Sequence, residues 1–402
     1  MSYSTQEFDV HDATLRAFNP RNLKRIDWLL PLLVLTLAAV GWANMYSASR
    51  SSDVTLFQKQ MVVFAAGAAL ALALVCVDYR FLVSLAPLFY GVAVLMLIAV
   101  VMFGTRVKGS ERWLALGPIR IQPSEFVKLI MVYTLTWYFT MIGSRIRKLP
   151  WFLLTFIISG VPMALILKQP NLGTAACLGP LTLAMLFVAG CRVSHLAVVL
   201  LAGLSLVPVV WWEIRNFDPK APPETVEQAS AMPVYELRHH QKMRIYTFLH
   251  PDADIGGSGW QTYQSKITVG SGGLKGKGYL QGTQTRLNYL PEHHNDFIYS
   301  LLAEEHGFIG AVVVIALFAV FLLRGLSYAR DCPEMTGTLL AAGVVAILAF
   351  HVFVNIAITV GLLPVTGIPL PFLSYGRSFY MTTMACVGVL LNVPMRRGMF
   401  TD

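Results

Sequence analysis

Long apolar runs constrain this chain of 402 residues more than any other feature of its sequence. Each run is about 20 residues long, enough for an α-helix to cross about 30 Å of hydrocarbon. The expected spans are 27–47, 57–77, 80–103, 124–142, 149–168, 172–190, 194–213, 297–323, 335–360 and 372–393. The sequence therefore predicts an all-α integral membrane protein with ten transmembrane helices and a large extracytoplasmic loop between helices 7 and 8.

Composition and charge narrow the class of protein further. Hydrophobic residues make up 55% and charged residues 13% of the chain, whereas about a quarter of a soluble domain is charged. The formal charge of +9 mainly reflects basic residues that anchor the inner side, so nucleic-acid binding is not expected. The five cysteines lie in spans or at inner ends and predict no disulfide framework and no CxxC metal site.

Lys and Arg residues predict the orientation, because basic residues in short loops stay in the cytoplasm. They precede the first span, join the fourth and fifth, and follow the eighth and tenth. Both termini are thus expected in the cytoplasm. The expected segments are a tail at 1–26, helices 1–7 over 27–213, a partly re-entrant outer loop over 214–296, helices 8–10 over 297–394 and a tail at 395–402.

The connection between the third and fourth spans breaks this charge pattern. It faces outward in the expected topology, yet "GTRVKGSERWLALGPIRIQPSEFVK" contains Arg106, Lys108, Arg112 and Arg120, with Trp113 beside them. Outer loops normally avoid such charge, so we expect the cluster to bind an anionic ligand. Contact with anionic lipid headgroups, or a local inversion of the topology, is the alternative.

Two ionisable residues follow within the same stretch, at the start of the fourth span. Glu125 and Lys128 are three residues apart and so share one helix face. Ionisable groups within a membrane indicate function, and Lys128 is suited to contact a phosphate as a point charge. The simpler interpretation is that the two charges neutralise each other.

The outer loop changes character along its length. Its first half, "NFDPKAPPETVEQASAMP", is predicted to be disordered because it has little apolar area to bury. Its second half is rich in glycine, contains Lys266, and holds no Walker A pattern. Glycines let backbone N–H groups approach an anion.

The loop ends in an acidic cluster at the start of the eighth span. Asp296 is expected to be an N-cap or first-turn acid of that helix or a general base held in a cavity, and the two roles are compatible. Glu292, His293, His294 and Asp296 lack the spacing of a zinc site. An Mg or Mn ion that bridges a carboxylate and a diphosphate is chemically easier, and the need for such a cation stays open.

Separated motifs then identify a family. "YSASR", "RWLALGPIRIQPSEFVK", "QPNLGTA", "YQSKITVGSGGLKGKGYLQGTQT", "LPEHHNDFIYSLLAEE" and "GLLPVTGIPLPFLSYGRS" occur in order. Together they resemble the SEDS family of bacterial cell-wall polymerases over essentially the whole chain. "GTQT" and "VTGIPLPF" resemble the elongation-specific branch more than the division-specific one.

The resemblance implies a peptidoglycan glycosyltransferase of the bacterial inner membrane that polymerises lipid II on the outer face. The catalytic aspartate of the family corresponds to Asp296, in "HHNDF". The leaving group would be undecaprenyl diphosphate, and the partner a class B penicillin-binding protein that crosslinks the new strand. The residues expected to bind substrate are Arg106, Lys108, Arg112, Trp113, Glu125, Lys128, Lys266 and Glu292, with Arg50 a weaker candidate.

The chain also departs from the family's usual motifs. Asn171 stands where the family usually has aspartate, and Arg377 where it usually has glycine. A lipid II flippase is the main alternative function, supported by Glu304 and Glu305, which lie about 12 Å down the eighth span from Asp296. Hydrogen bonds to a neighbouring span are an equally good explanation of these two acids, and a purely structural scaffold is a third function.

Overall fold

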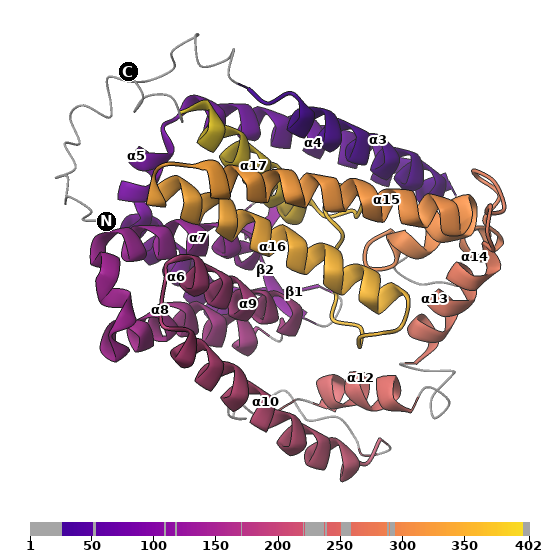
Figure 1. Ribbon diagram of the computed structural model, residues 1–402. Coiled ribbons are helices and arrows are strands. Elements are labelled where there is room, and N and C mark those ends of the chain that lie inside the picture. The colour runs from indigo at the N-terminus through magenta and orange to yellow at the C-terminus, as the bar shows by residue number, and fades with distance from the viewer. Residues whose placement is uncertain are drawn as a thin grey trace.

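Helices dominate the structure, a computed structural model that describes residues 26–50, 54–107, 110–116, 119–169, 171–219, 221, 237, 239–250, 259–287, 289 and 294–396 (Figure 1). The long helices are α3 (Leu29–Arg50), α4 (Val54–Cys76), α6 (Ala86–Phe103), α7 (Pro123–Ile142), α8 (Leu149–Lys168), α9 (Leu172–Val188), α10 (Val193–Arg215), α15 (Ile298–Asp331), α16 (Met335–Thr359) and α17 (Arg377–Met395). The short helices are α5 (Tyr79–Ser84), η1 (Gly143–Arg147), α12 (His239–Leu249), α13 (Trp260–Ser271) and α14 (Thr283–Arg286).

Each expected span contains one long helix, which confirms a multi-pass membrane protein. Among the described residues, nine helices are long and apolar enough to cross a membrane. The span expected at 172–190 forms α9, which is apolar but only 17 residues long. The count of ten therefore stays a prediction.

A small antiparallel sheet departs from the all-α prediction. Strands β1 (Thr105–Val107), β2 (Ser110–Leu116) and β3 (Ile119–Ile121) pair in the order β1-β2-β3. The segment between α6 and α7 is too polar for another helix across the bundle. The backbone groups of this segment still need hydrogen-bond partners. The segment therefore forms three short strands that pair with one another, with β2 in the middle.

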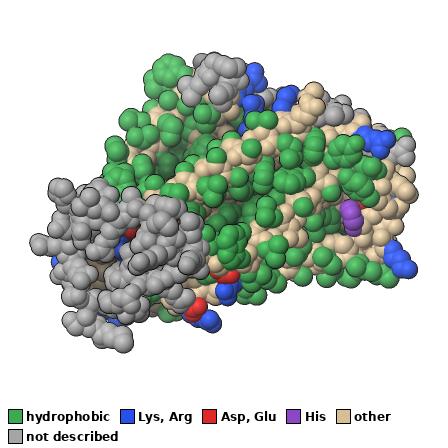
Figure 2. All heavy atoms as spheres, turned by 90° about the horizontal axis from the view of Figure 1, so that it is seen from above, with side chains coloured by type: hydrophobic (Ala, Val, Ile, Leu, Met, Phe, Trp, Pro, Cys, Tyr) green, Lys and Arg blue, Asp and Glu red, His purple; other side chains and the backbone are tan. Residues whose placement is uncertain are grey.

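The outer surface of the bundle fits a lipid environment. Hydrophobic side chains cover much of the face in Figure 2, and most of its charged side chains lie near its margins. Helix α10 shows this most clearly, because only Leu196 and Ile214 of its 23 residues are buried. An exposed apolar surface of this extent is expected where lipid rather than water surrounds the protein.

Ion pairs fasten the end of the bundle that is opposite to Asp296. Asp27, just before α3, accepts hydrogen bonds from Arg324 and Tyr328 near the end of α15. Asp78 caps α5 by accepting from the Arg80 N–H at 2.9 Å, and it also pairs with Arg396 at 3.3 Å. These contacts tie the first helices of the bundle to the last ones.

Helix α15 is broken near its start, at Gly307. The backbone there has φ 66° and ψ −168°, a conformation that is essentially restricted to glycine. The segment Gly272–Gly282, which we call the glycine-rich turn, packs against the break. Its Gly273 carbonyl accepts from the Phe308 N–H at 2.9 Å, and its Gly278 N–H donates to the Glu305 carbonyl at 3.0 Å.

The glycine-rich turn owes its close approach to its missing side chains. A Cβ atom at Gly272 would lie 2.0 Å from the Ala303 carbonyl oxygen, and one at Gly276 would lie 2.2 Å from that of Glu305. Non-helical backbone at membrane depth is tolerated only where protein or water satisfies it. The turn supplies those hydrogen bonds, so α15 can break without leaving its carbonyls unpaired.

Glu304 fastens the same turn through its side chain. Its Oε1 atom accepts from Lys277 Nζ at 2.7 Å and from the Gln284 N–H at 3.0 Å. Glu305 instead accepts from the Ser47 hydroxyl of α3. The anion that this glycine-rich segment approaches is thus a carboxylate of the protein itself. Hydrogen bonding to neighbouring segments accounts for Glu304, whereas the buried Glu305 Oε2 atom has no hydrogen-bond partner among the described residues.

We expect Gly307→Ala to destabilise the protein strongly. The added methyl group would meet the Gly276 nitrogen at 2.2 Å, and the backbone conformation alone costs about 1–3 kcal/mol for a non-glycine residue. Thermal unfolding of the detergent-solubilised protein measures the effect. Gly203→Ala in α10 is the matched control, because its Cβ atom would enter open space. Equal melting temperatures for the two variants would contradict this account of the break.

Candidate functional site

Asp296 lies immediately outside the first turn of α15 rather than at its cap. The N-cap residue is Phe297, whose side chain makes no capping hydrogen bond. Asp296 is therefore not the N-cap residue itself, and its carboxylate stands one position before it, near the positive end of the helix dipole. Its carboxylate approaches Gly367, where an added Cβ atom would lie 3.8 Å from Asp296 Oδ2. A glycine at this position leaves room beside the carboxylate.

Arg112 of β2 lies close enough to Asp296 for the two charges to interact. Its Nε atom donates to the Gln169 carbonyl at 3.3 Å. The pKa of Arg112 is lowered to about 10, chiefly by burial and also by the charge of Arg244, while the charge of Asp296 opposes both effects. The guanidinium thus stays cationic at neutral pH and partly desolvated.

Arg244 of α12 completes a cluster of three charges. Its Nη1 atom donates to the Val365 carbonyl at 3.0 Å, and α12 is tied to α10 by an ion pair of 2.8 Å between Lys242 and Glu213. Partial burial lowers the pKa of Arg244, while the charge of Asp296 raises it. The fold therefore brings two arginines from distant segments to one carboxylate.

Arg244 was not among the site residues predicted from the sequence. The signal was present, because "HHQKMRIY" is a second basic stretch within the predicted outer loop, and basic charge in an outer segment was the reason for selecting Arg112. The sequence does not show that this part of the loop folds back onto the helix bundle. Only the contact between α12 and the segment around Val365 brings Arg244 near enough for the charge of Asp296 to act on it.

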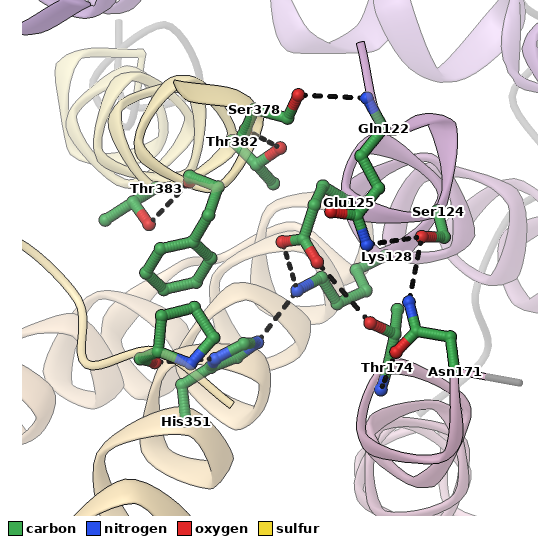
Figure 3. A network of polar contacts seen from close by, with 12 residues as sticks. Gln122, Ser124, Glu125, Lys128, Asn171, Thr174, His351, Ser378, Thr382 and Thr383 are labelled. Atoms are coloured by element: carbon green, nitrogen blue, oxygen red, sulfur yellow. Dashed lines mark hydrogen bonds and ion pairs between the residues drawn. The ribbon is translucent and has the colours of Figure 1, made fainter. Parts of the chain in front are cut away.

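Glu125 and Lys128 belong to a separate, buried polar network (Figure 3). Lys128 is 1% exposed, and its Nζ atom lies 2.7 Å from Glu125 Oε2 and 2.9 Å from His351 Nε2. The His351 Nδ1 atom lies 3.1 Å from the Pro369 carbonyl. Since a carbonyl only accepts, the imidazole proton is on Nδ1 and Nε2 accepts from Lys128. These contacts favour mutual neutralisation, and a role in binding substrate stays a prediction.

Asn171 extends the network toward the start of α9 (Figure 3). Its Oδ1 atom accepts from the Thr174 N–H at 3.4 Å, and its Nδ2 atom donates to the Ser124 hydroxyl at 3.3 Å. An amide can cap a helix and donate at the same time, whereas a carboxylate can only accept. Asn171 therefore fits the position where the family usually has aspartate, because both of its hydrogen-bond partners belong to the protein itself.

The other residues predicted to bind substrate lie in different surroundings. Trp113 follows Arg112 in β2, and Arg106 belongs to β1. Lys266 is an exposed residue of α13 that packs across Gly361, and Arg50 is exposed at the end of α3. Lys108 and Glu292 fall outside the described residues, as does His293. Within the part of the chain that the structure describes, no three His, Cys, Asp or Glu side chains form a metal site.

The fold and this charge cluster define a polytopic membrane protein whose polar site lies at one end of a helix bundle. Residues 25–398 match the family of cell cycle proteins that contains FtsW, RodA and SpoVE. The chain belongs to this family, and the SEDS resemblance of its motifs is confirmed.

Curated relatives match over nearly the whole chain. The peptidoglycan glycosyltransferase MrdB of Escherichia coli strain K12 is 33% identical over 94% of this chain and 95% of its own length. A probable peptidoglycan glycosyltransferase FtsW of Trichlorobacter lovleyi is 35% identical over 93% of this chain and 94% of its own. Identity at this level does not separate the two branches of the family.

Solved structures share the fold. A chain from a study of how a peptidoglycan synthase complex coordinates polymerization and crosslinking has a TM-score of 0.77 and 30% identity, and covers 94% of this chain and 99% of that one. The rod shape determining protein RodA of Thermus thermophilus has a TM-score of 0.65 and 27% identity, and covers 94% of this chain and 98% of its own.

We expect Lys128→Met to destabilise the bundle by about 3–5 kcal/mol, because it leaves Glu125 as a buried charge without its ammonium partner. The double variant Glu125→Gln/Lys128→Met should recover part of this loss. Thermal unfolding in detergent measures both. Arg330→Ala, which breaks an exposed pair with Asp331, is the control and should change stability by less than about 1 kcal/mol. A small effect of Lys128→Met would contradict the neutralisation account.

Proposed function

We propose that this chain is a peptidoglycan glycosyltransferase that polymerises lipid II into β-1,4-linked glycan strands. The observation that carries the proposal is the position of Asp296. It lies next to the start of α15, and its charge interacts with those of Arg112 and Arg244. A carboxylate suited to accept a proton thereby stands beside cations suited to bind a diphosphate.

Asp296 acts as the general base in this proposal. It takes the proton of the acceptor GlcNAc 4-hydroxyl as that oxygen attacks the anomeric carbon of the donor MurNAc. The bond from this carbon to the diphosphate breaks on the opposite face, and its electron pair leaves with undecaprenyl diphosphate. Inversion of the α-linked donor yields the β-1,4 linkage.

Arg112 and Arg244 stabilise the charge that develops on the departing diphosphate. Groups already oriented toward developing charge are often the largest catalytic contribution, and partial desolvation strengthens their interaction. Both guanidiniums are held by backbone carbonyls, those of Gln169 and Val365, so little reorganisation is needed when charge develops. A divalent cation such as Mg or Mn that bridges a carboxylate and the diphosphate stays a prediction.

We assign the chain to the elongation-specific, RodA-like role within the family, on the motifs "GTQT" and "VTGIPLPF". A class B penicillin-binding protein is the expected partner, in keeping with the synthase complex that one structural relative comes from. The expected location is the bacterial inner membrane, with both termini in the cytoplasm and Asp296 facing outward.

The alternative, a lipid II flippase, loses the support of Glu304. Glu304 accepts hydrogen bonds from Lys277, Thr283 and the Gln284 N–H, and it is fully buried. It therefore serves to hold the glycine-rich turn. A flippase would still move lipid II across vesicles without forming polymer, so the two functions are separable.

Asp296→Asn is expected to lower the polymerisation rate by about 10²–10⁴-fold, because the amide cannot accept the hydroxyl proton. The assay uses purified lipid II and the complex with the cognate penicillin-binding protein, and follows glycan strands on gels. Asp331→Asn at the opposite end of α15 is the matched control and should retain full activity. Normal polymerisation by Asp296→Asn would refute the assignment, and lipid II transport without polymer would favour the flippase.

Arg112→Ala and Arg244→Ala are each expected to lower kcat/KM by about 10²-fold or more, since each removes a cation from the developing charge. Steady-state polymerisation at varied lipid II concentration measures the change. Arg330→Ala removes a distant exposed cation and should leave the kinetics unchanged. If Arg244→Ala behaves like this control, then only Arg112 serves the diphosphate.

A further inference from the structure

Three consecutive backbone carbonyls that end at Asp296 each accept a hydrogen bond from elsewhere in the fold. The Tyr375 N–H donates to the His294 carbonyl at 2.9 Å, and the Ser374 hydroxyl donates to the Asn295 carbonyl at 2.6 Å. Asn355 Nδ2 donates to the Asp296 carbonyl at 2.9 Å. Residues 294–296 are not part of a helix, so these bonds replace the ones that a regular element would supply.

Ser374 is oriented by a second contact. Its side chain is fully buried, and its oxygen accepts from the Leu370 N–H at 2.8 Å. A serine hydroxyl has a single proton, and here that proton is directed to the Asn295 carbonyl. Ser374 thus links residues 367–376, which we call the loop before α17, to the segment that carries Asp296.

Asn355 makes the same link from α16. It is fully buried, and its two amide protons serve the Asp296 carbonyl at 2.9 Å and the Ile368 carbonyl at 2.7 Å. One side chain thereby joins the backbone of the acid to the loop before α17. Gly367 of that loop also borders the Asp296 carboxylate, so the loop forms one wall of the site.

The loop before α17 is itself held firmly. His351 contacts the Pro369 carbonyl, and the Phe372 ring packs on that of Phe321 with centroids 5.4 Å apart. Phe372 has φ 65°, a strained conformation for a bulky residue that persists only where its surroundings enforce it. Gly41 of α3 leaves space for the Phe372 carbonyl, which a Cβ atom would meet at 2.3 Å.

We propose that Ser374 and Asn355 are positioning residues for Asp296, which set the place of its carboxylate without touching the substrate. The inference rests on the proposed role of Asp296 as general base. A base must stay within hydrogen-bonding reach of the hydroxyl proton, and a misplacement of about 1 Å can cost about 10²-fold in rate. Loosening residues 294–296 therefore lowers kcat and leaves the binding of lipid II intact.

Ser374→Ala tests the proposal in the reconstituted complex. We expect kcat for polymerisation to fall by about 10- to 100-fold, with KM for lipid II little changed and the melting temperature lowered by the loss of buried hydrogen bonds, as in the Ser159→Ala control described below. Ser374→Thr keeps the hydroxyl and should restore most of kcat. Asn355→Leu, which removes both donors at similar volume, should give the same split between kcat and KM.

Ser159→Ala in α8 is the matched control. Its hydroxyl is also buried and hydrogen-bonded, to Thr182 at 2.9 Å, but it is remote from Asp296 in the bundle. Loss of this bond should leave kcat unchanged. If Ser159→Ala and Ser374→Ala reduce kcat equally, a general loss of buried hydrogen bonds explains the effect and the positioning role is overturned.

The remaining outcomes separate the two proposals. Unchanged kcat in Ser374→Ala together with an inactive Asp296→Asn overturns the positioning role alone, whereas an active Asp296→Asn overturns the proposed function. Should Ser374→Ala fail to fold, Ser374→Cys retains the size of the side chain and a weak donor. An intermediate kcat for Ser374→Cys supports the role, and a wild-type kcat overturns it.

Discussion

The need to satisfy backbone hydrogen bonds away from water determines how the site is built. Helix α15 breaks at Gly307, and the glycine-rich turn supplies the partners that the broken helix lacks. Lys277 and Glu304 then fasten the turn by an ion pair. The first turns of α15 are held in place by these contacts, and with them Asp296, just before the helix.

Two groups of charges serve different purposes in the bundle. Glu125, Lys128 and His351 satisfy one another within the protein interior, where an unpaired charge would be costly. Arg112, Arg244 and Asp296 instead form a second group, outside the long helices, in which each arginine interacts with the charge of Asp296. Helix α16 joins the two groups, because His351 and Asn355 lie one turn apart and both contact the loop before α17.

Several parts of this organisation could be predicted from the sequence. Apolar runs located every long helix, although α15 continues to Asp331, beyond its expected end at 323, and charge in an unexpected place identified Arg112. The small sheet was missed, because three short strands carry little pattern beside the helices around them. The N-cap of α15 was predicted at Asp296, one residue before its observed position. Helix ends depend on local backbone geometry that composition does not reveal.

The sequence by itself determined that the chain crosses a membrane and belongs to the SEDS family, because hydrophobic length and ordered motifs are local properties. Only the tertiary structure decided which charges meet. Arg112, Arg244 and Asp296 are separated by more than 50 residues at each step, and folding alone brings them together. It also decided that Glu304 holds a turn and that Ser374 and Asn355 hold Asp296, because a hydrogen bond depends on distance and direction in space.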